Sequence, residues 1–321
     1  MYSVILRNSI KLDNLKMEIN LSESIDSIAY TADIKMVVPE EMSKNLLLKE
    51  GDPIEIVKNK DPGKGTVFKG VIWHKNTTMK HTKIASLICK ERTIYIEKSE
   101  DEYLFKEGTT ATQRAKQMCS DWGIPIGNFA DTKIPLAKTP PRVGTIYGMM
   151  LEDLRETAQK GGSLFKYRMQ NKLDLIEIGS NEVVHDISNI LETINQTGTL
   201  EGAVTKVKVL GKQEDDKKSP VIGLYSKDTD KLGTLQRVIQ DEKIQDPGTA
   251  KAKAEAMFSK GEGSIQVSGI DIPEIRAGDK VKLNGFYVYV TNVVHKLGEP
   301  GRMELVLESL DQIRGKYYAN S

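Results

Sequence analysis

Two stretches that lie far apart in this sequence follow the same order of turns and strands. In the first, a Gly51-Asp52 turn precedes an alternating strand, and the next strand ends in apolar residues followed by His74. In the second, Gly278-Asp279 and His295 hold the corresponding places, and a further strand closes each stretch. Alternation of apolar and polar residues with period two is typical of strands that bury one face. The sequence therefore predicts two copies of one small β domain.

The residues that precede each copy support a duplication. Residues 19–28 and 32–37 form a strand, a polar loop and an alternating strand, and residues 194–203 and 205–209 repeat that order. The alternative is that any two β meanders look alike at this level of detail. Agreement in turn chemistry as well as in alternation favours the duplication. We therefore interpret six residues as structural repeat positions: Gly51, Asp52, His74, Gly278, Asp279 and His295.

The bulk properties exclude several classes of protein. At 321 residues the chain is too long for one ordinary core and suits about two to four domains. Its net charge of +1 gives no reason to expect a specific nucleic-acid partner. No apolar run is long enough to span a membrane, and the first residues lack a signal-peptide pattern, so stable membrane insertion is not expected. Cys89 and Cys119 do not suggest a disulfide framework, which fits synthesis in a reducing cytoplasm.

Changes of period divide the chain further. Residues 1–98 are predicted to form the first β domain, and residues 99–185 an α/β module spliced in after it. Residues 186–211 and 264–321 are predicted to form the second β domain. Residues 212–263 interrupt that domain with a charged loop and a helical insertion. The expected fold class is therefore α+β and rich in strands.

Helical spacing of apolar residues locates the helices. Two are expected in the module, over residues 109–123 and 149–161, and each ends at glycine. A hairpin over residues 163–178 follows them, and a third helix over residues 249–258 lies in the insertion. The charged loop at residues 212–218 is most often a solvated tip, with a contact surface as the alternative.

The sequence offers little support for catalysis. No close pair of His, Cys or carboxylate residues has a recognised metal-ligand spacing, and the equivalent placing of His74 and His295 favours a structural role. Neither a Ser-centred nucleophile elbow nor a Cys-His signature can be identified. Carboxylates are plentiful, so a glycosidase pair is not excluded by counting alone. We expect a protein that is not an enzyme, with no catalytic, cofactor-binding or metal-ligating residues.

The order of elements resembles that of a known family, the central hub proteins of contractile phage baseplates. Relatives of these hubs occur in defective prophages, phage-tail-like bacteriocins and type VI-like injection devices. The residues that carry the resemblance are 250–258, 261–264, 270–281, 287–295, 151–162 and 173–175. The similarity in element order covers nearly the whole chain, but it is specific mainly in the last quarter.

The resemblance implies both an architecture and a set of partners. Hubs of this family are homotrimers in which two related small β-barrels per chain form a six-barrel, pseudo-hexameric ring. One face of the ring binds the sixfold tail tube, and the other receives the threefold central spike. A threefold assembly can match a sixfold ring only if each chain carries the contact patch twice. The implied partners are the tail tube protein and the spike protein, with tape-measure and baseplate wedge proteins as further candidates.

Two further expectations follow. The protein should assemble in a bacterial cytoplasm as a component of a phage tail or tail-like particle. Because open strand edges are pairing sites in a ring, the first and last strands of each β domain should face neighbouring subunits. The alternative function is a cell-wall hydrolase or a carbohydrate-binding component of the tail tip.

Overall fold

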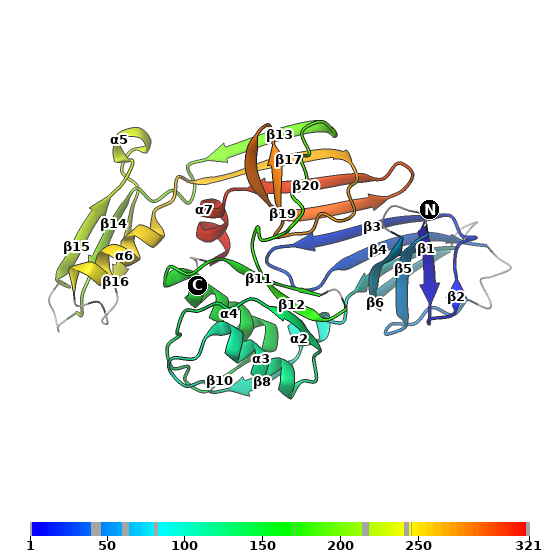
Figure 1. Ribbon diagram of the computed structural model, residues 1–321, viewed down its shortest axis with the longest axis horizontal. Coiled ribbons are helices and arrows are strands. Elements are labelled where there is room, and N and C mark those ends of the chain that lie inside the picture. The colour runs from blue at the N-terminus through cyan, green and yellow to red at the C-terminus, as the bar shows by residue number, and fades with distance from the viewer. Residues whose placement is uncertain are drawn as a thin grey trace.

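The computed structural model describes residues 2–39, 46–59, 64–79, 83–169, 171–213, 218–240, 244 and 246–318. Figure 1 shows the first β unit at one end, the second β unit beside it, the α/β module below them and the insertion at the far end. The fold is α+β and rich in strands, as the sequence predicts. In the described ranges no helix has the length and apolar character needed to cross a membrane.

Seven strands make up the described part of the first β unit. They are β1 (Tyr2–Leu6), β2 (Ile10–Lys11), β3 (Met17–Ser24), β4 (Thr31–Val38), β5 (Pro53–Lys58), β6 (Gly65–Met79) and β7 (Lys83–Lys90). In β4, the apolar side chains Ile34 and Met36 are buried while the charged residues that alternate with them, Asp33 and Lys35, are exposed. Complete burial of such a side chain contributes about 1.5–3 kcal/mol. The period-two pattern therefore aims one face of the strand into a core that also contains Leu21, Ile56 and Phe68.

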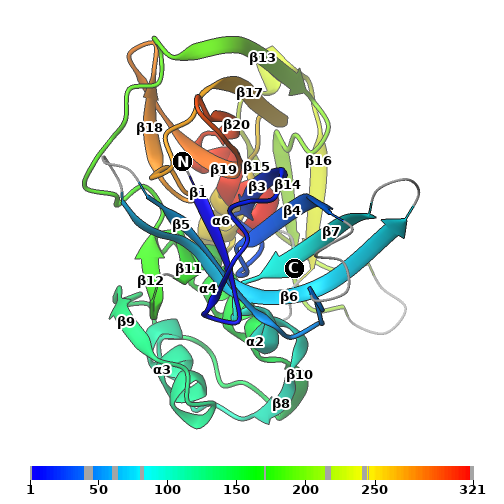
Figure 2. The ribbon, with the colours of Figure 1, turned by 90° about the vertical axis from the view of Figure 1, so that its right-hand side faces the viewer.

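The second β unit has five strands with their own apolar core. They are β13 (Leu191–Thr199), β17 (Glu262–Ile270), β18 (Lys280–Leu283), β19 (Phe286–Leu297) and β20 (Arg302–Glu308). Val267, Ile275, Val281, Val293 and Leu305 pack together in that core. Seen from the end in Figure 2, this unit lies above the first one.

The two β units share one order of strand pairing. In the first the order is β3-β4-β7-β6-β5, and in the second it is β13-β17-β20-β19, with β18 paired to β19. Pairing of β3 with β19 joins both into a single sheet that contains twelve strands in the described part of the chain. The second strand of the second unit is thus β17, where the sequence led us to expect residues 205–209.

That difference arises from the insertion, which forms a sheet of its own. Its elements are β14 (Lys206–Leu210), β15 (Val221–Ser226), α5 (Thr229–Leu232), β16 (Gln236–Gln240) and α6 (Pro247–Met257). Strand β14 pairs with β15 and β16, so the boundary expected at residue 211 falls before residue 206. Val207, Val209, Ala250 and Ala254 form a separate small core. Residues 214–217 of the charged loop lie outside the described residues.

The α/β module lies between the two β units in sequence. It comprises α2 (Ile94–Lys98), β8 (Glu100–Tyr103), α3 (Ala111–Asp121), β9 (Ile126–Phe129), β10 (Arg142–Thr145), α4 (Ile146–Gln159), β11 (Phe165–Met169) and β12 (Leu173–Glu177). The two predicted helices and the hairpin are confirmed. Thr110 caps α3 by accepting from the Gln113 amide, and Gly123 follows its end with a positive φ.

The segment after β20, which the sequence led us to place in the second β unit, packs on this module as well as on that unit. After β20 the chain forms α7 (Leu310–Ile313) and a π-helical turn, η1 (Arg314–Tyr318). Ile313 and Tyr318 join the apolar core of the module. The Tyr318 hydroxyl donates to the Phe165 carbonyl at 2.6 Å. The segment formed by α7 and η1 thus lies between the module and the main sheet (Figure 1).

Candidate assembly interface

The two Gly-Asp turns make the same backbone hydrogen bonds. Gly51 N donates to Ile72 O at 2.8 Å, and Gly278 N donates to Val290 O at 2.7 Å. The aspartate carbonyls accept from the amides of the same two residues, Ile72 and Val290, at 2.9 Å in both turns. Both glycines have positive φ, 85° and 93°, a conformation that side chains disfavour. Each turn therefore fixes the start of one strand against the middle of the next.

The aspartate side chains in these turns also act alike. The Asp52 carboxylate accepts from Lys49 N at 2.9 Å, and the Asp279 carboxylate accepts from Arg276 N at 2.8 Å. Such a bond to a nearby amide stabilises a tight turn. Each carboxylate also pairs with an arginine, but the arginines come from different parts of the fold. Asp52 binds Arg7 at 2.7 Å, and Asp279 binds Arg168 of the module at 2.8 Å.

The histidines do not share a register, in contrast to their predicted equivalence. Ile72 and Val290 each precede a bulge, after which His74 lies opposite Ile88 and Asn292 lies opposite Val306. The counterpart of His74 is therefore Asn292. His74 follows Ile72 by two residues, whereas His295 follows Val290 by five, and the shared pattern of apolar residues followed by His-Lys conceals that difference in the sequence.

The surroundings of the histidines differ accordingly. His74 is exposed, whereas His295 has no exposed surface. His295 Nδ1 lies 2.6 Å from an Asp271 oxygen, and its Nε2 lies 2.9 Å from Ile275 O. His295 thus ties β19 to the segment that precedes the Gly278-Asp279 turn.

One buried cluster of charges joins the two β units and the module. Arg276 Nε of the second unit donates to the Glu23 carboxylate of the first at 2.6 Å, and Lys166 Nζ of the module lies 3.5 Å from it. The Glu23 and Lys166 side chains are each 1% exposed. Burial alone would raise the pKa of Glu23, but the positive charges of Arg276 and Lys166 outweigh it and lower the pKa to about 2. The carboxylate is therefore charged throughout the physiological range.

The sequence reasoning missed this cluster, although one signal for it was present. Glu23 falls in β3 on the same inward face as Ile19 and Leu21, and an acid at such a position needs a buried cation. The partners could not be predicted because Lys166 and Arg276 come from distant elements. Arg276 also lies 4.0 Å over the Tyr30 ring.

In the described part of the main sheet, the open strand edges are β13, the second half of β6 and the two-residue strand β2 at the other end of the sheet. Strand β13 ends the main sheet, and its outer edge has no strand partner among the described residues. Strand β5 covers β6 only as far as Val71, so residues 74–79 have a strand, β7, on one side alone in that same part of the chain. The last strands, β7 and β20, are paired on both sides, so the expectation that they face neighbouring subunits is wrong.

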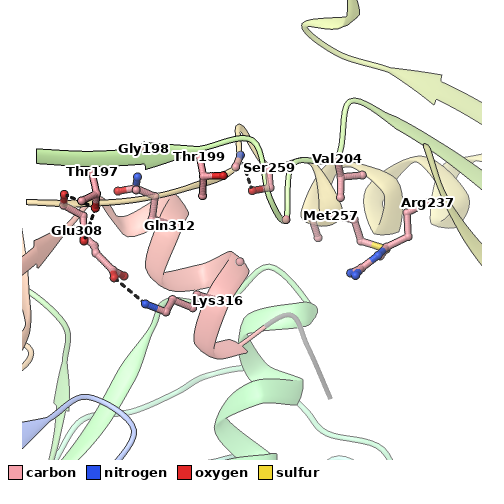
Figure 3. A pocket seen from close by; sticks show the side chains of 16 residues that line it. Thr197, Gly198, Thr199, Val204, Arg237, Met257, Ser259, Glu308, Gln312 and Lys316 are labelled. Atoms are coloured by element: carbon pink, nitrogen blue, oxygen red, sulfur yellow. Dashed lines mark hydrogen bonds and ion pairs between the residues drawn. The ribbon is translucent and has the colours of Figure 1, made fainter. Parts of the chain in front are cut away.

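A cavity of about 230 Å³ lies where the insertion meets the second β unit (Figure 3). The ends of β13 and α6 line it with small residues, among them Gly198, Thr199 and Ser259. Lys316 borders it and pairs with Glu308 at 3.1 Å. In the described ranges, no group of three His, Cys, Asp or Glu residues is placed to hold a metal ion. This region is a junction between domains and displays no recognisable catalytic constellation.

Comparison with solved structures identifies proteins with a similar fold. The prophage MuSo2 43 kDa tail protein from Shewanella oneidensis matches with a TM-score of 0.74 and 10% identity, over 97% of this chain and 99% of its own. The tail protein from Neisseria meningitidis MC58 matches with a TM-score of 0.69 and 13% identity, over 99% of both chains. The Escherichia coli c3393 protein matches with a TM-score of 0.55 and 8% identity, over 95% of this chain and 76% of its own. It is described as a type VI secretion component similar to the bacteriophage T4 tail proteins gp27 and gp5.

Comparison of the sequence with a family profile gives a match over most of the chain, whereas no curated protein matches the chain in sequence. The profile of one family, described as YQBQ-like, matches residues 15–308, which include the module, the insertion and, apart from β1 and β2, the strands of both β units. The match of the family profile to most of the chain shows that the chain, whose fold is that of prophage tail proteins, belongs to the YQBQ-like family.

Proposed function

We propose that this protein is a structural hub of a contractile tail or tail-like injection particle. Three chains form a pseudo-hexameric ring that adapts the sixfold tail tube to the threefold central spike. The observation that supports this most strongly is the repeated unit. Strand order, Gly-Asp turn and bulge recur in both β units, and the two units lie side by side in one sheet. A chain that presents one contact patch twice lets three molecules match six.

The surroundings of the repeat fit a fixed adaptor. A ring that transmits force between a tube and a spike needs its two repeated units held at one relative angle. The continuous β3–β19 ladder and the buried Glu23–Arg276 pair both hold them. The tail-protein fold and the absence of a recognisable catalytic constellation among the described residues favour this function over a cell-wall hydrolase or a carbohydrate-binding component. The tail tube and spike proteins are the proposed direct partners, with tape-measure and baseplate wedge proteins as further contacts.

The test is a native mass measurement of the 35.8 kDa chain, alone and with the tube and spike proteins of the same particle. We expect a species with three times the chain mass, either alone or once the spike is present. An image of the assembled particle along its axis should show six similar lobes from three chains. A chain that stays monomeric with both partners would overturn the proposal. Clearing of purified cell wall by the isolated chain would favour the hydrolase.

A further inference from the structure

We propose that β13 of one protomer pairs antiparallel with residues 74–79 of β6 in the next, with Ile194 opposite Met79 and Thr199 opposite His74. This inference rests on the trimer proposed above and specifies how its subunits join. It also gives the ring a direction, because the two edges are different strands. Both views place β13 and β6 apart on the protomer, as a head-to-tail contact requires (Figures 1 and 2).

The template is the joint inside the protomer. There β3 pairs antiparallel with β19, with Ser24 opposite Asn292 and Ile19 opposite Leu297. By strand order β3 corresponds to β13, and β19 corresponds to β6. If the ring repeats its internal joint between subunits, β13 must therefore meet β6.

The positions of the two bulges determine which residue of β6 corresponds to which residue of β19. Ile72 and Val290 each accept a hydrogen bond from the glycine of a Gly-Asp turn and stand just before the bulge. Counting on from them, His74 corresponds to Asn292 and Met79 to Leu297. The uncovered segment of β6 thus coincides with the segment of β19 that β3 covers.

The residue pairs across the strands of each unit determine which residue of β13 corresponds to which residue of β3. In the first unit, Leu21 lies opposite Ala32, which lies opposite Cys89. In the second unit, Gln196 lies opposite Ile265, which lies opposite Leu307. Cys89 and Leu307 are themselves equivalent, because they lie opposite Ile72 and Val290.

It follows that Leu21 corresponds to Gln196, and Ile19 to Ile194. Transferring the internal register then gives six cross-subunit pairs. They are Ile194–Met79, Asn195–Thr78, Gln196–Thr77, Thr197–Asn76, Gly198–Lys75 and Thr199–His74.

The exposure of both strand edges supports a second copy of this chain as the partner that covers them. Residues 192–199 of β13 are all exposed, and the stretch from Thr193 to Leu200 carries no charged residue. A long uncharged edge is a pairing site unless something covers it. Met79 is 69% exposed and Ile194 is 52% exposed, whereas the internal counterpart Ile19 is 7% exposed. The proposed register brings these two exposed apolar side chains together.

The experiment uses cysteines placed across the joint in the full-length chain. Thr78→Cys with Asn195→Cys should form disulfides between protomers on mild oxidation, under the condition in which native mass shows the trimer. Side chains directly opposite each other on paired strands lie within the reach of a disulfide. Cys89 and Cys119 do not interfere, because burial raises the pKa of each thiol to about 12.

Two controls match this pair. Asn20→Cys with Lys296→Cys places the same register pair in the internal joint and should link within one chain. Thr78→Cys with Gln196→Cys shifts the register by one residue, which points the side chains to opposite faces of the sheet. We expect cross-linking of the aligned pair to be about tenfold faster than that of the shifted pair, since disulfide geometry is strict.

The outcomes separate this inference from the proposed function. A native trimer whose aligned pair fails to link, or links no faster than the shifted pair, overturns the β13–β6 register and leaves the adaptor standing. Dimers formed by Asn195→Cys alone would indicate pairing of β13 with itself and would also overturn it. A chain that never forms a trimer overturns the adaptor itself. If the double variant does not fold, amide exchange of the unaltered chain decides, because trimer formation should slow exchange in residues 74–79 and 193–199 together.

Discussion

The Glu23 carboxylate of the first β unit accepts a hydrogen bond from Arg276 Nε of the second unit at 2.6 Å, and the two side chains are 1% and 14% exposed. The same carboxylate oxygen also accepts from Ala277 N at 3.1 Å. Arg276 and Ala277 lead directly into the Gly278-Asp279 turn. One buried carboxylate therefore links the edge strand of the first unit to the repeated turn of the second, beside the β3–β19 joint.

Replacement of Arg276 by alanine should strongly destabilise the protein. Glu23 would keep Lys166 at 3.5 Å and the more distant charge of Arg168, and removal of one member of a buried ion pair typically reduces stability by about 3–5 kcal/mol. Lys296→Ala is the control, because its pair with Glu304 is about half exposed and should change stability by about 0–1 kcal/mol. Denaturant unfolding measures both. Equal effects of the two changes would contradict a structural role for the cluster.

Glu91 should make the protein less stable as the pH rises. Burial raises the pKa of Glu91 from 4.5 to about 8. Since the folded state holds the proton more tightly than the unfolded chain, this contribution is complete below pH 4.5 and is lost as the pH rises through 8. Glu91→Gln should flatten the dependence of Tm on pH between 5 and 9. A variant whose profile still parallels that of the parent protein would show that another group is responsible.

Replacement of the two histidines by leucine should give different results. His295→Leu removes the partner of the buried Asp271 carboxylate and of Ile275 O, and each unsatisfied buried group costs about 1–3 kcal/mol. His74→Leu changes an exposed side chain and should shift stability by no more than about 0.5 kcal/mol. Thermal unfolding of both variants tests whether the register or the sequence pattern identifies equivalent positions. Similar losses in the two variants would favour the sequence pattern.

Local patterns predicted the elements well, because strands and helices depend on nearby residues. Alternation located β5, β6, β18 and β19, and glycines located the ends of α3 and α4. Partner choice was less predictable. Strand β14 alternates as regularly as β17, and alternation of apolar and polar residues does not determine with which strands a given strand pairs.

The candidate interface was predictable in part. The Gly-Asp turns were identified because glycine and aspartate have specific roles in turns. The edges were predicted only in part: β13, the first strand of the second unit, is an open edge, but β7 and β20 are paired on both sides, since the identity of an edge strand depends on the complete sheet order. The shift between His74 and His295 was not predicted, because the two histidines follow equivalent bulges at different distances and the position of a bulge is not evident from the local sequence.

The insertion should be removable without loss of the main sheet. Residues 200–261 leave and re-enter the second unit at Thr199 and Glu262, which already lie opposite each other in the β13–β17 ladder. An Asn-Gly pair in place of these residues would close that ladder as a two-residue hairpin. Because the insertion buries Val207 and Val209 in its own core, its removal exposes little of the main core. We expect the shortened chain to keep its strand-rich circular dichroism spectrum and a cooperative thermal transition.

Val207→Asp in the full chain is the matched control and should unfold the insertion alone, at a lower temperature than the main sheet. A single transition lowered as a whole would instead show that the insertion and the second β unit fold as one body.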